Sequence, residues 1–317
     1  MGDTEGETRI AIGCQGGGSL TAFTAGALSE IIEQHGTEDL VAISGTSGGA
    51  MCATLAWDGL VDGDEARARA NLRNFWTDLA ANGFWEQWFN QLTVTYTSLK
   101  ESGLPTPEVS PYDNPFSEWG RRQLGRLLTR YVEFDRPTGP ESAHPALYLG
   151  AVDITTDRFR VFDHSELAVE KVLASASLPP LFPAMEIDGR YYWDGLLSEN
   201  PPLGVLTDHH PDEIWIVQVN SPERAEEPRT ITSIFDRRNE LAGNLSLEQE
   251  VDFIEKVNAM VAADVIDDPA YKHIEVKRLV LEEQLSYAQK VNRDPAFLED
   301  LFQEGQVVAD EFLAQQG

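Results

Sequence analysis

The sequence is short of cysteine and of long apolar runs. Only Cys14 and Cys52 occur among its 317 residues, and two thiols cannot form the disulfide framework of a small secreted protein. No apolar run approaches the roughly 18 residues that a membrane-spanning helix needs. The polar, acidic residues 1–8 lack the charged and apolar regions of a secretion signal. We therefore expect a cytoplasmic protein without a transmembrane helix.

Positive charge is also scarce. The 24 lysine and arginine residues face 53 aspartate and glutamate residues, which gives a formal net charge of −29. This balance excludes nucleic acid as a partner, because a polyanion would be repelled. The acidic residues are spread along the whole chain, as in proteins adapted to high intracellular salt, where the Debye length falls to about 3 Å at 1 M. Anionic lipid would be repelled too, so membrane contact is expected to be transient, apolar and local.

The motifs of common cofactors and metals are missing. The run Gly16-Gly17-Gly18 is followed by Thr21 where a dinucleotide fingerprint needs glycine or alanine, and it lacks the Gly-Lys-Ser/Thr ending of a phosphate loop. Histidine, cysteine, aspartate and glutamate do not cluster at the spacing of metal ligands. We expect no cofactor and no metal ion, and nothing in the sequence indicates an oligomeric state.

What the chain does contain is a Gly-x-Ser-x-Gly motif, Gly45-Thr46-Ser47-Gly48-Gly49. The apolar residues 40–43 predict a buried strand before it, and the small residues 50–57 predict a closely packed helix after it. Such a strand-turn-helix unit is typical of a nucleophile elbow, in which the turn exposes the Ser47 hydroxyl. Because a motif this short also occurs by chance, a plain tight turn is the alternative interpretation.

A second glycine turn lies nearer the N-terminus. Residues 9–14 predict a strand that runs into Gly16–Gly18, and the apolar spacing of residues 20–32 predicts a helix. Strand, helix, strand and helix in this order predict an α/β fold with three layers and a mostly parallel central sheet. The unhindered amides of the glycine run, together with that of Gly48, suit an oxyanion hole. A tight turn without a ligand is again the alternative.

Two further blocks lie at residues 174–179, with the pattern Ala-Ser-x-x-x-Pro, and at Asp194-Gly195. Together with the glycine loop and the elbow, they resemble the patatin-like phospholipase family in content and order over residues 13–205. The resemblance implies a lipid acyl hydrolase of the phospholipase A or esterase type, with a Ser47–Asp194 dyad and an acyl-enzyme intermediate. It also implies the oxyanion donors Gly16, Gly17, Gly18 and Gly48. The aromatic residues 191–193 would desolvate the Asp194 carboxylate and make it a stronger base.

Departures from the family pattern leave two alternatives open. Thr21 stands where glycine is usual and Leu20 where a basic residue is usual, and Leu196 replaces the small residue after Asp194-Gly195. These changes suit a non-catalytic lipid-binding or acyl-binding homologue. A Ser-His-Asp esterase of the α/β-hydrolase type is the other alternative. Its base would be one of the histidines that follow in chain order, which are His209, His210 and His273.

The rest of the chain carries fewer signals. Residues 84–119 combine many aromatic side chains with prolines, which predicts either an acyl-chain pocket or its lid, or else a core helix followed by a surface loop. Asp188-Gly189 predicts the tight turn of a β-hairpin. We expect residues 9–225 to form the catalytic domain. Residues 226–317 are expected to be a helical and mixed extension that packs on the same domain.

Overall fold

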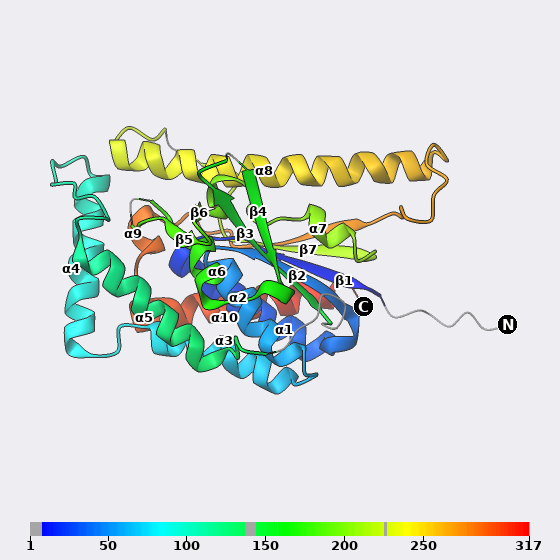
Figure 1. Ribbon diagram of the computed structural model, residues 1–317, viewed down its shortest axis with the longest axis horizontal. Helices are drawn as coiled ribbons and strands as arrows, with labels where there is room; N and C mark the ends of the chain where they lie inside the picture. The colour runs from blue at the N-terminus through cyan, green and yellow to red at the C-terminus, as the bar shows by residue number, and fades with distance from the viewer. Residues whose placement is uncertain (1–7, 137–143, 157, 180, 225–226, 317) are drawn as a thin grey trace.

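An eight-stranded sheet forms the middle layer of the protein, as the computed structural model shows (Figure 1). The structure describes residues 8–136, 144–156, 158–179, 181–224 and 227–316. Residues 1–7, where no secretion signal is expected, lie outside the described residues. The strands are β1 (Ile10–Cys14), β2 (Leu40–Thr46), β3 (Ala146–Asp153), β4 (Arg158–Asp163), β5 (Met185–Ile187), β6 (Arg190–Asp194), β7 (Glu213–Gln218) and β8 (Glu275–Val280).

The strands are mostly parallel. The order across the sheet is β5-β6-β3-β2-β1-β7-β8, with β4 paired to β3 outside this path. The pairs from β3 through β2, β1 and β7 to β8 are parallel, whereas β4, β5 and β6 join in antiparallel pairs. The mostly parallel α/β fold that the sequence predicts is therefore confirmed.

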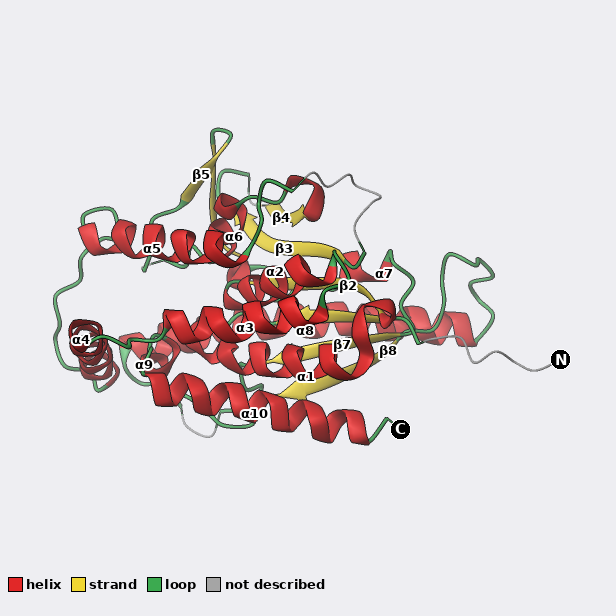
Figure 2. Cartoon of the chain, turned by 90° about the horizontal axis from the view of Figure 1, so that it is seen from below, coloured by secondary structure: helices red, strands yellow, loops and turns green. Residues whose placement is uncertain are grey.

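Helices cover both faces of this sheet (Figure 2). No helix among the described residues is long and apolar enough to cross a membrane. The α-helices are α1 (Thr21–Asp39), α2 (Gly48–Leu60), α3 (Glu65–Leu79), α4 (Phe84–Glu101), α5 (Pro115–Tyr131), α6 (Val169–Ser175), α7 (Gly204–Thr207), α8 (Ile231–Ala262), α9 (Tyr287–Lys290) and α10 (Pro295–Ala314). The short 3₁₀ helices are η1 (Gly18–Leu20), η2 (His164–Glu166) and η3 (Gly195–Leu197).

The buried strands divide the core in two because successive side chains point to opposite faces of a sheet. In β1, Ile10 and Ile12 belong to the larger core, which also includes residues of α1, α2, α3 and α10. Ala11 between them belongs to the smaller core, together with Ile214 of β7 and Leu247 of α8. Figure 1 shows α8 lying on one side of the sheet and α1, α2 and α10 on the other. This arrangement is the three-layer architecture expected from the sequence.

The C-terminal third contributes to each layer. Strand β8 extends the sheet by pairing with β7, α8 covers one face, and α10 packs along α1 on the other. The boundary between residues 9–225 and 226–317 stays a prediction. The hairpin at Asp188-Gly189 is confirmed, because β5 and β6 pair across it and both turn residues have positive φ angles.

Candidate active site

Ser47 occupies a sharp turn between β2 and α2. Its φ of 57° and ψ of −126° lie outside the ordinary regions for a residue with a side chain, and it directly precedes the first residue of α2. The turn is closed by glycines on both sides. A Cβ atom on Gly45 would lie 2.5 Å from the Gly49 carbonyl oxygen, and one on Gly49 would collide with the Cys14 carbonyl. Ser47 itself stays half-buried and therefore reachable.

The turn is held from outside by Ser175, the last residue of α6. The Ser47 amide donates to Ser175 Oγ at 3.0 Å, and Ser175 Oγ donates to the Gly150 carbonyl at 2.6 Å. Two residues later, the Ser177 carbonyl accepts a hydrogen bond from the Asp194 amide at 3.1 Å. The block at residues 174–179 therefore anchors the backbone at Ser47 and at Asp194. Sequence analysis singled out this block but assigned no role to its serines.

Sheet register explains why Ser47 and Asp194 meet. Thr46 of β2 pairs with Gly150 of β3, and the next residue of β3, Ala151, pairs with Asp194 of β6. Gly195 continues this close approach, because a Cβ atom on it would lie 2.5 Å from the Gly150 carbonyl oxygen. Ser47, the candidate nucleophile, directly follows β2, and Asp194 is the last residue of β6. Because β3 lies between β2 and β6, the two residues lie on either side of β3.

The Asp194 carboxylate is fully buried. Its Oδ1 accepts a hydrogen bond from the Leu196 amide at 2.8 Å, whereas Oδ2 has no hydrogen-bond partner among the described residues. Burial raises the pKa of Asp194 to about 7, although the Leu196 amide and the neighbouring Ser47 hydroxyl both act to lower it. The Ser47 hydroxyl is thus close enough to affect the carboxylate, and Oδ2 remains free to accept a proton.

The glycine loop after β1 lies against the turn at Ser47. A Cβ atom on Gly16 would be 2.7 Å from the Ser47 Cβ. The Gly16 amide donates to Asn200 Oδ1 at 2.7 Å, and the Gly16 carbonyl accepts from Asn220 Nδ2 at 2.7 Å. The Gly16 amide, which the sequence suggests as an oxyanion donor, is therefore already engaged by Asn200.

The amides of Gly17, Gly18 and Gly48 have no acceptor among the described residues. Gly18 has a φ of 61° and lies directly beneath the Lys290 carbonyl of α9, so only glycine fits there. Thr21 donates its hydroxyl proton to the Gly18 carbonyl at 2.7 Å, and a Cβ atom on Gly48 would collide with the Thr21 hydroxyl. Thr21 therefore closes the loop against the first residue of α2.

A buried amide network supports the loop, and sequence analysis missed it. Gln15 Oε1 accepts from the Val219 and Asn220 amides at 3.0 and 2.8 Å, and Gln15 Nε2 donates to Asn244 Oδ1 at 2.8 Å. Asn200 completes the network through Gly16. The only available signal was that Gln15 directly follows the first predicted strand, and an amide side chain at such a position is too common to single out.

The histidines of the alternative mechanism lie away from Ser47. The backbone carbonyls of His209 and His210 accept hydrogen bonds from the side chain of Arg9, which directly precedes β1. His273 lies two residues before the start of β8. These are the amino ends of parallel strands, whereas Ser47 follows the carboxyl end of β2. The structure therefore does not bring a base from this group to the serine.

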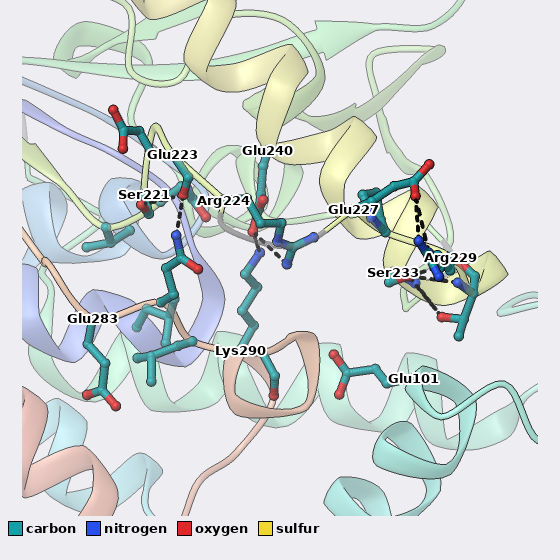
Figure 3. Close-up of a pocket in the computed structure, with 18 residues that line it drawn as sticks. Glu101, Ser221, Glu223, Arg224, Glu227, Arg229, Ser233, Glu240, Glu283 and Lys290 are labelled. Carbon is teal, nitrogen blue, oxygen red and sulfur yellow. Dashed lines mark hydrogen bonds and ion pairs between the residues drawn. The ribbon is translucent and has the colours of Figure 1, made fainter.

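A cavity of about 550 Å³ opens beside the glycine loop (Figure 3). Leu20, Val219 and Asn220 form its wall on the side of the loop, but Ser47 and Asp194 do not line it. Figure 3 shows Lys290 reaching toward Glu240, to which it forms an ion pair of 2.7 Å. Because its other walls carry many charged side chains, the cavity does not suit an acyl chain. Among the described residues, no group of three potential ligands could hold a metal ion.

The aromatic stretch at residues 84–119 does not form a core helix. Helix α4 exposes its large side chains, for example Trp85 at 68% and Phe89 at 52%. The core-helix interpretation is therefore wrong. The apolar spacing does correspond to a helix, but the apolar face of that helix points to solvent and not to the core. An acyl-chain pocket or lid in this stretch stays a prediction.

One comparison with known proteins identifies a family. A family model described as "Patatin-like phospholipase" matches residues 14–207, more than half of the chain. No curated protein sequence matches. VipD from Legionella pneumophila is 12% identical with a TM-score of 0.47, over 98% of this chain and 67% of that one. The type III effector ExoU is 15% identical with a TM-score of 0.37, over 98% and 53%. Human GIVD cytosolic phospholipase A2 is 14% identical with a TM-score of 0.31, over 50% and 23%.

Proposed function

The chain belongs to the patatin-like phospholipase family, and from this premise we propose that it is a lipid acyl hydrolase that cleaves carboxylic esters through a Ser47–Asp194 dyad. The observation that carries the proposal is the buried Asp194 carboxylate. Its Oδ2 lacks a partner among the described residues, while the Ser47 hydroxyl acts on the same carboxylate. A buried acceptor beside a serine in a strained turn is the arrangement that nucleophilic catalysis needs.

In the proposed reaction, Asp194 accepts the hydroxyl proton as Ser47 Oγ attacks the ester carbonyl carbon. The amides of Gly17, Gly18 and Gly48 stabilise the oxyanion of the tetrahedral intermediate. Asp194 then gives its proton to the leaving alcohol, and an acyl-enzyme remains on Ser47. Water hydrolyses this ester with Asp194 again as the base. Because burial raises the pKa of Asp194 to about 7, the carboxylate is a stronger base than it would be in water and still ionises near neutral pH.

The departures from the family pattern are compatible with this chemistry. The Thr21 hydroxyl holds the Gly18 carbonyl, and thereby fixes the loop that a glycine would leave more mobile. Leu196 contributes its backbone amide to Asp194, which a residue of any size could do. Neither side chain therefore argues for the non-catalytic lipid-binding alternative.

The test is hydrolysis of a medium-chain p-nitrophenyl ester in molar potassium chloride. Ser47→Ala and Asp194→Asn are each expected to lower kcat at least about 1,000-fold. Asp188→Asn changes the exposed Asp-Gly turn of the hairpin and should retain the parent rate. A folded parent that binds fatty acid but neither turns over ester nor reacts with a serine-directed phosphonate would establish the lipid-binding alternative instead.

The remaining assignments follow from the same premise. We propose that residues 9–225 carry the catalysis and that residues 226–317 are an extension of the same domain. The substrate is a lipid or lipid-like ester, and the reaction needs no cofactor. The low cysteine content favours a cytoplasmic location. The acidic composition favours a cytoplasm of high salt concentration.

A further inference from the structure

Helix α4 buries polar side chains and exposes apolar ones, which is the reverse of an ordinary surface helix. The residues it buries are the polar Asn90 and Thr97. Asn90 pairs with the loop before α10, donating to Asn292 Oδ1 at 2.9 Å and accepting from the Arg293 amide at 2.8 Å. The outward side chains are large and apolar, and their exposed fractions range from 41% to 74%: Phe84, Trp85, Trp88, Phe89, Leu92, Tyr96 and Leu99. A helix that only needed to pack on its own protein would show the opposite pattern.

The seven outward side chains of α4 include no charged residue, and each of the three charged residues of the helix has a partner. Glu86 accepts a hydrogen bond from the Gly83 amide at the start of the helix. Lys100 forms an ion pair with Glu108, and Glu101 accepts from the Tyr287 amide that begins α9. In a chain with a net charge of −29, this face is nearly neutral. An anionic or cationic partner would find no complementary charge on it, whereas an electrically neutral surface would meet no repulsion.

The face is linked to the proposed active site through α9. Glu101 at the end of α4 binds the amides of Tyr287 and Ala288 in α9, and the Lys290 carbonyl at the other end of α9 lies over Gly18. Figure 1 shows the carboxyl end of β1 pointing toward the end of the molecule where α4 and α9 lie. A surface that binds α4 would therefore lie at the same end of the molecule as Ser47.

We propose that the aromatic face of α4 docks the protein on a neutral, zwitterionic lipid surface. The proposal rests on the proposed function, since a lipid acyl hydrolase finds its substrate in such a surface. Tryptophan, tyrosine and phenylalanine are the side chains that settle at the boundary between headgroups and acyl chains. Seven such or similarly apolar side chains on one face of a helix, with no charge among them, match the apolar face of a helix that lies in a lipid interface.

The experiment measures binding to phosphatidylcholine vesicles by flotation in molar potassium chloride. The double variant Trp85→Ser/Trp88→Ser is compared with Phe253→Ser, which removes an equally exposed side chain from α8, since Trp85 and Phe253 are both 68% exposed. The expected result is at least about a tenfold weaker partition for the double variant and an unchanged partition for Phe253→Ser. Equal unfolding midpoints would show that all three proteins are folded.

A parent protein that does not float, or a double variant that floats as well as the parent, would overturn the docking proposal. So would a parent that forms dimers in sedimentation velocity without binding vesicles, when the double variant stays monomeric, because a second copy would then be the occupant of the face. Hydrolysis of a monomeric short-chain p-nitrophenyl ester is measured in parallel. Failure of that reaction would count against the hydrolase, and failure of flotation against the docking face, so the two outcomes are distinguishable.

Discussion

The Ser175 hydroxyl accepts a hydrogen bond from the Ser47 amide at 3.0 Å, and so holds from outside the turn that carries the proposed nucleophile. The Ser175 hydroxyl in turn donates a hydrogen bond to the Gly150 carbonyl of β3 at 2.6 Å. Because Ser47 adopts a φ of 57° that a residue with a side chain rarely tolerates, this bond helps to offset the backbone strain. We therefore expect Ser175 to be a positioning residue that acts through the Ser47 backbone.

Replacing Ser175 with alanine should slow the reaction without removing any reacting group. We expect kcat for the ester to fall between about 10-fold and 100-fold, because a small displacement of the nucleophile costs rate in this range. Ser177→Ala is the matched control, since both serines are fully buried and, among the described residues, the Ser177 hydroxyl bonds only to the Leu173 carbonyl of the preceding helix α6. Equal rates for the two variants would mean that Ser175 has no special role.

Much of the fold could be predicted because its signals are local. The apolar run before Ser47, the strand before Gly16 and the Asp188-Gly189 turn each depend on a few adjacent residues, and all three appear as predicted. Chain order then favoured a mostly parallel sheet. The antiparallel edge of β4, β5 and β6 beside β3 could not be derived in the same way, because pairing between distant strands leaves no local pattern.

The supporting part of the site was out of reach for the same reason. Gln15 and Asn220 are 205 residues apart, and Gly16 and Asn200 are 184 apart, yet each pair forms a hydrogen bond. Asparagine is common in loops whether or not it is buried. Helix α4 shows a different failure: periodicity reveals that one side of a helix is apolar, but it does not say whether that side faces the core or the solvent.

The amide network predicts an effect of Asn200 on both stability and rate. Asn200→Ala leaves the buried Gly16 amide without an acceptor, which should cost about 1–3 kcal/mol in the free energy of unfolding and lower kcat as the glycine loop loosens. Asn258→Ala is a suitable comparison, because Asn258 makes two hydrogen bonds to Ile274 far from the loop. The control should lose comparable stability in chemical denaturation and keep its rate per folded molecule. A similar loss of rate in both variants would contradict a positioning role for Asn200.

The pKa of Asp194, raised to about 7 by burial, sets the expected pH dependence of the reaction. If Asp194 is the base, as proposed, it must be ionised, so kcat should rise with pH through about 7 and level off above it. Burial also raises the pKa of Glu199 to about 7. Glu199→Gln therefore serves as the control, and its kcat profile should keep the same inflection. If the inflection disappeared in Glu199→Gln, the group whose ionisation controls kcat would be Glu199 and not Asp194.

The same pKa shift predicts that Asp194→Asn stabilises the protein at alkaline pH. Between the ordinary pKa of 3.8 and the folded value of about 7, the folded state keeps a proton that the unfolded chain has released, so stability falls as pH rises through this window. Asparagine has no such proton and can still accept from the Leu196 amide. The variant should be more stable than the parent by about 2–4 kcal/mol at pH 8 and nearly equal to it at pH 4. Urea titrations at the two pH values measure this difference, and the exposed Asp188→Asn should show none.

Salt should stabilise the folded protein, because it screens the repulsion between exposed acidic residues more than the attraction within buried ion pairs. Repulsion within a net charge of −29 is spread over the exposed surface, where a Debye length of about 10 Å at 0.1 M falls to about 3 Å at 1 M. Attractive pairs such as Lys290 with Asp236 and Glu240 are largely buried and are screened less. The loss of repulsion therefore outweighs the loss of attraction. We expect the thermal unfolding midpoint to rise on the order of 10 °C between 0.1 and 2 M potassium chloride. Sucrose of equal osmolality separates screening from solvent exclusion, and a midpoint that rose equally in sucrose would argue against charge repulsion as the cause.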